Sequence, residues 1–289
     1  MKKIEISSSK IDKVLNIVST DIDGLSYSLA NKLLRKKDIR VNDKKISDNI
    51  FVGIGDKITV FVPDNYNETI TKEDNFFEIV YEDDNVLFIN KFKGIEVCSP
   101  TEKITIENIL KKRFSKIYAL NRLDRNTEGL VILAKTKIIL EKIKKEMKDG
   151  AIEKFYLAEV VGNPKWNNFT ATGYLLKDDE KSEVRIWDKP VKDSKKITTE
   201  LSVLSRSAGG TSVFIVKIKN GKTHQIRAHL AYLDFPIVGD GKYGKYNENK
   251  KFKSKTQKLT AYKLVFNFKD PELEYLNEKS LEITPSWIK

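Results

Sequence analysis

A single acidic residue between two arginines stands just before an apolar run in this chain. Asp124 lies between Arg122 and Arg125, and residues 130–134 (LVILA) follow after a short polar stretch. A short apolar run next to turn residues indicates a buried strand, so the chain has to fold with a carboxylate at the start of such a strand. Neighbouring cations favour the ionised carboxylate. That group can attack carbon or take a proton, and it can equally serve as a simple turn cap.

The positive charge of the chain favours an anionic partner. Its 289 residues carry 53 Lys and Arg against 41 Asp and Glu, a net charge of +12. Nucleic acid is the first candidate for this partner, and a membrane surface is the second. The apolar runs are too short to span a membrane, no signal peptide is visible, and the single Cys98 excludes an internal disulfide. These features predict a globular, cytoplasmic protein that binds nucleic acid.

Residues 1–63 are predicted to form a small separate domain. A helix is expected over residues 25–35, with its leucines near one face. Residues 39–46 predict two short strands around an Asn-Asp turn, and the alternating residues 57–62 predict a third strand. Residues 31–45 hold seven Lys or Arg and two Asp. This basic surface is either a solvated face or a contact for nucleic acid.

An acidic stretch follows this first domain. Residues 64–85 contain eight acidic residues and the single basic residue Lys72. Such a polar stretch is typical of a linker. We assign the linker to residues 64–75 and a second, longer domain to residues 76–289, with its first clear strand at residues 86–89.

The second domain alternates strands and helices. Thr136 is expected to cap a helix that ends at Asp149 and Gly150, and residues 155–161 predict a strand. A β meander is expected over residues 182–187, 197–204 and 212–219. Strands joined by hairpins form antiparallel or mixed sheets, so the predicted class is α+β with a mixed, mostly antiparallel sheet.

Both histidines of the chain lie in one segment, residues 219–230. His224 and His229 are five positions apart, which does not place both on one helical face, so a zinc site is not expected. Thr223 is expected to cap a helix that starts at His224. Arg227 would then project from the first turn, where a guanidinium can pair with a carboxylate or a phosphate.

A tyrosine in the predicted strand at residues 155–161 is a second candidate for the site. Strand alternation places Tyr156 on one face together with Lys154 and Ala158. Tyr156 is either a packing residue, or it stacks on a base and offers its hydroxyl to a proton.

In these motifs the chain resembles the RluA-type pseudouridine synthases, with a small S4-like RNA-binding domain in front. The resemblance covers nearly the whole length, and its motifs occur in the family's order. They are residues 81–84 (YEDD) with 90–94 (NKFKG), 121–124 (NRLD) with 127–130 (TEGL) and 133–135 (LAK), 154–158 (KFYLA), 221–227 (GKTHQIR) with 229–230 (HL), 236–240 (PIVGD) and 243–244 (YG), and 259–266 (LTAYKLVF).

The resemblance implies an enzyme that isomerises uridine in RNA to pseudouridine without a cofactor or a metal. It implies Asp124 as the carboxylate beside the ribose, Arg227 as its ion-pair partner, and Tyr156 as the residue that stacks on the uracil and assists removal of the C5 proton. Arg122 resembles the residue that fills the place of the flipped base. The implied substrate is large-subunit ribosomal RNA, and a monomer is expected. Further RNA contacts are implied at Lys32, Arg35, Lys36 and Arg40.

Four positions depart from the family pattern. Phe92 stands where Pro is usual, Asn121 where His is usual, Glu128 where Ser is frequent, and Lys222 where Arg is usual. These departures concern the RNA target and the fine contacts with the substrate, because none of them removes Asp124 or its implied partners.

Two other classes of function compete with this interpretation. A ribosome-associated RNA-binding protein of the S4 type, without activity, would explain the charge and residues 1–63, but not the three motifs that hold Asp124, Tyr156 and Arg227. A phosphate-handling hydrolase would require the clustered acids of two-metal chemistry, and the sequence lacks them.

Overall fold

The computed structural model describes residues 1–22, 25, 27–63, 76–102, 104–178, 183–219 and 221–288. Up to Pro63, four strands form a sheet in the order β1-β6-β3-β4, and a short pair, β2 with β5, lies beside it. The bounds are β1 Lys2–Ser7, β2 Asp12–Lys13, β3 Ile39–Val41, β4 Lys44–Lys45, β5 Phe51–Val52 and β6 Lys57–Val62, with the helices α1 Val14–Asp21 and α2 Tyr27–Arg35.

The N-terminal elements agree in part with the sequence predictions. The strands around Asn42 and Asp43 and the strand β6 are confirmed. Asn42 and Asp43 have φ values of 48° and 64°, the left-handed backbone that a two-residue hairpin turn needs. The predicted helix begins two residues later than expected, at Tyr27, and the helix α1 and the strand β1 were not predicted.

The N-terminal part has a hydrophobic core of its own, whose buried side chains come from the segment that runs from Val14 to Val62. The cores of the remaining chain draw on residues from Phe77 onward. Among the described residues, a hydrogen bond joins the two parts directly, from the Asn31 side chain on α2 to the carboxylate of Asp84, at 2.8 Å. The predicted linker at residues 64–75 lies outside the described residues.

The second part is built on an 11-stranded sheet in the order β13-β12-β14-β15-β11-β16-β10-β8-β7, with β17 beside β16 and β9 beside β10. The bounds are β7 Phe77–Glu82, β8 Val86–Lys91, β9 Tyr118–Ala119, β10 Glu128–Ala134, β11 Ile152–Val161, β12 Asn168–Asp178, β13 Glu183–Trp187, β14 Lys195–Arg206, β15 Thr211–Ile218, β16 Leu259–Phe266 and β17 Leu281–Glu282.

This sheet confirms the α+β class predicted from the sequence. Its strand pairs are antiparallel apart from β10 with β16, which is parallel. The parallel pair depends on Gly129, which has φ 128° and faces Ala261. A Cβ atom at Gly129 would lie 2.4 Å from the carbonyl oxygen of Ala261.

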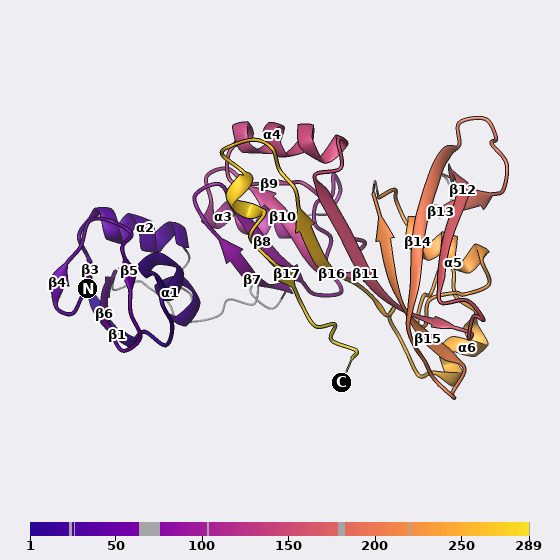
Figure 1. The fold of residues 1–289 in the computed structure, drawn as a ribbon, viewed down its shortest axis with the longest axis horizontal. Coiled ribbons are helices and arrows are strands. Elements are labelled where there is room, and N and C mark those ends of the chain that lie inside the picture. Colours follow the sequence, from indigo (N-terminus) through magenta and orange to yellow (C-terminus); the bar gives the residue numbers. More distant parts are fainter. Residues whose placement is uncertain are drawn as a thin grey trace.

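The helices divide between the two ends of this sheet, with β11 running between them (Figure 1). At one end lie α3 Ile106–Arg113 and α4 Lys137–Lys148, and at the other lie α5 Gln225–Tyr232 and α6 Tyr246–Lys251, while a 3-10 turn spans Glu274–Leu276. The predicted cap of α4 is confirmed, because the hydroxyl of Thr136 accepts a hydrogen bond from the Ile139 amide at 3.2 Å.

Strands are confirmed at the three positions of the predicted β meander, as β13, β14 and β15, but the meander itself is wrong, because β12 lies between β13 and β14 in the sheet. Five strands of this sheet, β7, β9, β12, β16 and β17, were not predicted. β7 lies in the acidic stretch that reads as linker, and β12 has too few apolar residues to stand out.

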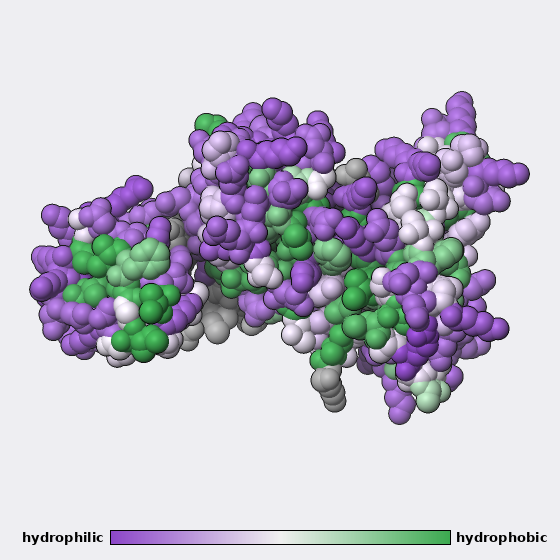
Figure 2. Space-filling view, viewed as in Figure 1, coloured by the Kyte–Doolittle hydropathy of each residue, from purple (hydrophilic) through white to green (hydrophobic). Residues whose placement is uncertain are grey.

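Hydrophilic side chains cover most of the face in Figure 2, and apolar residues gather on the N-terminal part. Exposed large apolar residues of that part include Ile11, Ile50, Phe51 and Ile54. Within the described ranges, no helix is long and apolar enough to cross a membrane.

Candidate active site

Asp124 and Arg227, which are 103 positions apart in the sequence, meet in the folded chain. Asp124 lies in the loop between β9 and β10, and Arg227 lies in the first turn of α5. The Nη1 group of Arg227 donates a hydrogen bond to Oδ2 of Asp124 at 2.8 Å. The Asp124 side chain is about one-quarter exposed, so this carboxylate is held by a cation and is still open to a substrate.

Arg227 is itself fixed by a second carboxylate. Its Nε and Nη2 groups donate to the two oxygens of Asp240 at 2.7 and 2.9 Å. Asp240 is fully buried and also accepts hydrogen bonds from the backbone amides of Lys242 and Tyr243. A two-point pair of this kind fixes the plane of the guanidinium as well as its position, so the third group, Nη1, is aimed at Asp124.

The charges of this cluster stabilise one another. Burial alone would lower the pKa of Arg227, but the hydrogen bonds and charges of Asp240 and Asp124 raise it above its usual value. Burial alone would raise the pKa of Asp240, but the guanidinium and two backbone amides lower it. Arg227 and Asp240 are therefore both charged at neutral pH.

The loop that carries Asp124 is tied to the end of β8 by a buried lysine. Lys91 has no exposed surface, and its ammonium donates to the backbone carbonyls of Phe92, Ile95 and Arg125 at 2.9, 2.9 and 3.2 Å. Burial lowers the pKa of Lys91 to about 7, although the charge of Asp124 opposes this shift. Arg125 follows Asp124 directly, so this lysine fixes the backbone beside Asp124.

Tyr156 lies in the core next to the same acid. It occupies the middle of β11, opposite Val216 on β15 and Ala261 on β16, and it is buried. Burial raises the pKa of the Tyr156 hydroxyl, and the negative charge of Asp124 raises it further. The structure thus brings Asp124, Tyr156 and Arg227 into one site, while their roles remain predictions.

The start of α5 differs from the sequence prediction. The helix begins at Gln225, and His224 occupies the capping position with a left-handed backbone, φ 53°. Thr223 was predicted as the cap, and this prediction is wrong. The side-chain oxygen of Gln225 instead accepts a hydrogen bond from the Lys222 amide at 3.1 Å.

The two histidines have different surroundings. Nε2 of His224 lies 3.7 Å from Oδ2 of Asp124, whereas His229 is fully buried, with Nδ1 2.9 Å from the hydroxyl of Thr199. Burial lowers the pKa of both imidazoles, that of His229 to about 4.

The predicted RNA-binding residues lie at two places. Arg122 is exposed, two positions before Asp124, at the edge of the site. Lys32, Arg35 and Lys36 are exposed on or just after α2, and Arg40 is half-buried, with its guanidinium 5.0 Å from the centre of the Phe61 ring. The structure does not bring this second group to Asp124, because α2 and α5 lie at opposite ends of the molecule (Figure 1).

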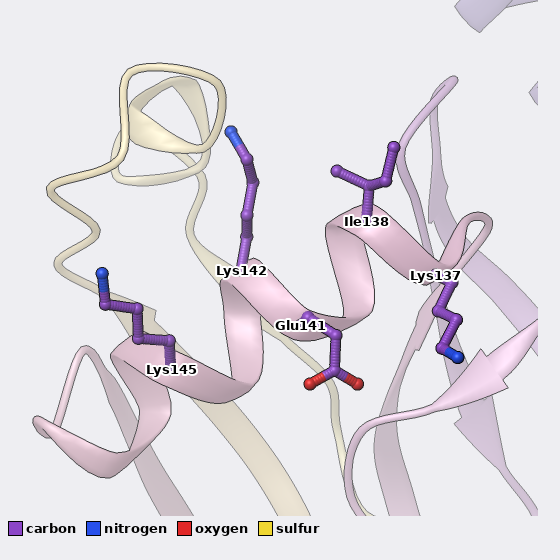
Figure 3. Close-up of a pocket in the computed structure, with 5 residues that line it drawn as sticks. All are labelled: Lys137, Ile138, Glu141, Lys142 and Lys145. Carbon is purple, nitrogen blue, oxygen red and sulfur yellow. The ribbon is translucent and has the colours of Figure 1, made fainter.

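A surface pocket on α4 is not part of this site. Its lining residues, Lys137, Ile138, Glu141, Lys142 and Lys145, all come from the one helix (Figure 3). The ammonium of Lys142 is already paired with the carboxylates of Asp270 and Glu272, at 3.0 and 2.9 Å.

Three residues around Asp124 were not predicted from the sequence as members of the site: Lys91, His224 and Asp240. Each lies inside a motif that was singled out. The signal that could have found Asp240 is a lone acid in an otherwise apolar and glycine-containing segment, residues 236–240 (PIVGD), because a buried acid needs a charged partner.

Comparison with known proteins shows the family of this chain. Residues 85–232 match the protein family described as RNA pseudouridylate synthase. The chain is 30% identical over 251 residues to the ribosomal large subunit pseudouridine synthase C of Buchnera aphidicola subsp. Baizongia pistaciae, covering 82% of this chain and 78% of that one. It is also 30% identical over 285 residues to an uncharacterized RNA pseudouridine synthase of Mycoplasma capricolum, covering 90% of each chain.

A solved structure shows the same fold. The human RNA pseudouridylate synthase domain containing 1 matches with a TM-score of 0.59 and 24% identity, over 72% of this chain and 83% of that one. The chain therefore belongs to the RNA pseudouridylate synthase family. It is an enzyme that isomerises uridine in RNA to pseudouridine.

Proposed function

We propose that this enzyme modifies uridine in large-subunit ribosomal RNA and that Asp124 is its reacting acid. One observation carries the second part of the proposal, namely the chain of contacts from the buried Asp240 through Arg227 to the part-exposed Asp124. Because Asp240 fixes the guanidinium of Arg227, the third nitrogen of that guanidinium holds the accessible carboxylate of Asp124 in one orientation.

The isomerisation needs such a carboxylate. The bond between N1 of uracil and C1′ of ribose breaks, and a bond between C5 and C1′ forms. The proton on C5 is lost, and N1 gains one, so the atoms balance without a redox step. An ionised oxygen of Asp124 serves either addition to C1′ or removal of a proton from the sugar. Within the described chain, Arg227 and His224 both face Oδ2 of the Asp124 carboxylate. The other oxygen, Oδ1, is therefore available to the ribose.

Tyr156 is proposed to pack against the flipped uracil. Its ring lies in the core beside Asp124, and a base that leaves its stack needs an aromatic or apolar surface. The raised pKa of its hydroxyl opposes proton abstraction by the phenolate, so the stacking part of its predicted role is favoured over the basic part.

The rest of the protein is proposed to hold the RNA. Residues 1–63 serve as an S4-like RNA-binding domain, with Lys32, Arg35, Lys36 and Arg40 on phosphates, and Arg122 fills the place of the flipped base. The net charge of +12 supports these contacts with RNA.

The relatives named large subunit pseudouridine synthases support the ribosomal target. We expect the protein to be a monomer in the cytoplasm.

Tritium release from RNA labelled at uracil C5 tests this proposal. Unmodified large-subunit ribosomal RNA, small-subunit ribosomal RNA and tRNA are compared as substrates, with EDTA present. We expect release from the large-subunit RNA by the wild type and none by Asp124→Asn. Asp149→Asn makes the same chemical change at an exposed residue after α4 and should leave the rate unchanged. Release from tRNA alone would contradict the ribosomal target, and normal release by Asp124→Asn would contradict the assigned acid.

A further inference from the structure

His224 and Tyr243 form a hydrogen-bonded pair, and the free end of this pair faces the reacting acid. Nδ1 of His224 lies 2.9 Å from the hydroxyl of Tyr243, and Nε2 of the same ring lies 3.7 Å from Oδ2 of Asp124. The two rings meet edge to face, with their centres 5.6 Å apart. The His224 side chain is 16% exposed, so the imidazole borders the place where a substrate has to lie.

The donors along this pair run in one direction. The backbone amide of Val184 donates to the hydroxyl oxygen of Tyr243 at 3.0 Å. With this oxygen accepting, the phenol proton is available to donate to Nδ1 of His224. A neutral imidazole that accepts at Nδ1 carries its own proton on Nε2, and this proton then points toward the carboxylate of Asp124.

The surroundings of His224 favour this neutral form. Burial lowers the pKa of its imidazole, and the positive charges of Arg227 and Lys242 lower it further, while the charges of Asp124 and Asp240 oppose the shift. His224 also stands at the N-terminus of α5, where the helix dipole disfavours a cation. At neutral pH the ring is therefore a donor without charge.

We infer that His224 is a positioning residue for the Asp124 carboxylate, oriented by Tyr243 and donating from Nε2 to Oδ2 beside the Arg227 guanidinium. This inference rests on the proposed role of Asp124. A separation of 3.7 Å is longer than a hydrogen bond, and such contacts often tighten when a substrate binds. Two donors on one oxygen fix the rotation of the carboxylate and present Oδ1 to the ribose.

The backbone at His224 adds support. Its φ of 53° lies in the left-handed region, which is uncommon for residues other than glycine, and such positions gather at functional sites. The conformation places the ring over Tyr243 and beside Asp124, although the helix cap itself gains no side-chain hydrogen bond from it.

Three substitutions separate positioning from packing. Tyr243→Phe removes one hydroxyl but keeps the ring 5.2 Å from the guanidinium of Arg227. His224→Asn suits the left-handed backbone, but its short side chain does not reach Asp124. His224→Gln can place an amide N–H where the Nε2 proton lies.

Nitrogen-15 NMR of the imidazoles tests the tautomer directly, because the chain has only two histidines, and His224→Gln assigns their signals. At pH 7 we expect neutral His224 with its proton on Nε2 in the wild type. A proton on Nδ1 would overturn the inference. This spectrum needs no turnover, so it tests the pair even if the proposed role of Asp124 fails.

Single-turnover rates test the consequence. We expect His224→Asn and Tyr243→Phe to slow isomerisation about tenfold with unchanged RNA affinity, as for the loss of one hydrogen bond to a charged group. His224→Gln should retain most of the rate. Equal losses in all three variants, accompanied by weaker RNA binding, would show that His224 only packs the start of α5 and would overturn the inference.

Discussion

Asp240 holds Arg227 by both carboxylate oxygens, at 2.7 and 2.9 Å, and leaves one nitrogen of the guanidinium to bind Asp124. The pair is buried, while Asp124 at its end is partly exposed. The site therefore places its fixed charges in the interior and leaves Asp124, the proposed reacting group, accessible. The buried carboxylate of Asp240 determines the plane of the Arg227 guanidinium. Substitutions at Asp240 should therefore change the rate of the reaction although Asp240 does not contact the substrate.

Asp240→Asn should slow catalysis and destabilise the fold together. An amide can accept only one of the two hydrogen bonds, and it leaves the charge of Arg227 with less compensation. Loss of one partner of a buried pair costs about 3–5 kcal/mol, so we expect a large fall in the free energy of unfolding, measured by urea denaturation. The single-turnover rate should fall at least tenfold. Asp270→Asn is the matched control, since Asp270 pairs with Lys142 at the surface and should change stability by about 1 kcal/mol or less.

Arg227 should matter more for turnover than for RNA affinity. Arg227→Lys keeps a positive charge but cannot bind Asp240 at two points and Asp124 at a third. We expect the single-turnover rate to fall by about two orders of magnitude, as when a group that stabilises charge in an active site is removed, while the Kd for RNA changes little. Filter binding and rapid quench on the same RNA measure the two quantities. A variant with normal turnover and weakened binding would show that Arg227 contacts phosphate instead.

Protonation of His229 should destabilise the protein in acid. Its pKa is lowered by burial to about 4 in the folded protein, whereas an unfolded histidine titrates near 6.5. The unfolded state therefore binds the proton first, and stability is lost as the pH falls from about 6.5 to about 4, by up to about 3 kcal/mol.

Urea denaturation at pH 7 and pH 4.5 measures this loss. His229→Gln should make the difference between the two pH values smaller, because it removes the titrating group and keeps a polar side chain beside Thr199. An unchanged difference in this variant would assign the acid sensitivity to other residues.

The sequence predicted the members of the site better than their contacts. Motif order could bring Asp124, Tyr156 and Arg227 together, but it could not show that Asp240 completes the pair, because a buried ion pair depends on tertiary distance. Cap preference predicted Thr223, yet His224 took the capping position with the left-handed backbone. A local propensity of about 1 kcal/mol is easily overridden by tertiary contacts around the site.

Two departures from the family pattern have local explanations in the structure. The amide of Phe92 donates to the carbonyl of Phe76 at 2.8 Å, a bond that the usual proline could not form. The side chain of Asn121 accepts from the Ile132 amide at 2.8 Å and donates to the Leu130 carbonyl at 3.2 Å, so it secures the loop before Asp124 to β10. Neither contact could be read from residue type alone.

A third departure, Glu128, binds the C-terminal segment to the start of β10. Its buried carboxylate accepts hydrogen bonds from the Thr260 hydroxyl at 2.8 Å and from the Ser286 amide and hydroxyl at 3.0 and 2.6 Å. The indole of Trp287 donates to the same Thr260 hydroxyl at 2.8 Å. The serine that is frequent at this position in the family is too short to make these bonds.

A double-mutant cycle should reveal this coupling. Glu128→Ser should lower the free energy of unfolding by about 1–3 kcal/mol, because it leaves the buried hydroxyl of Thr260 without its acceptor, and Ser286→Ala should cost about 1 kcal/mol. The double variant should lose less than the sum, since both changes remove one shared contact. Additive losses would show that the two residues act independently, and the C-terminal segment would then owe its position to Trp287 and Thr260.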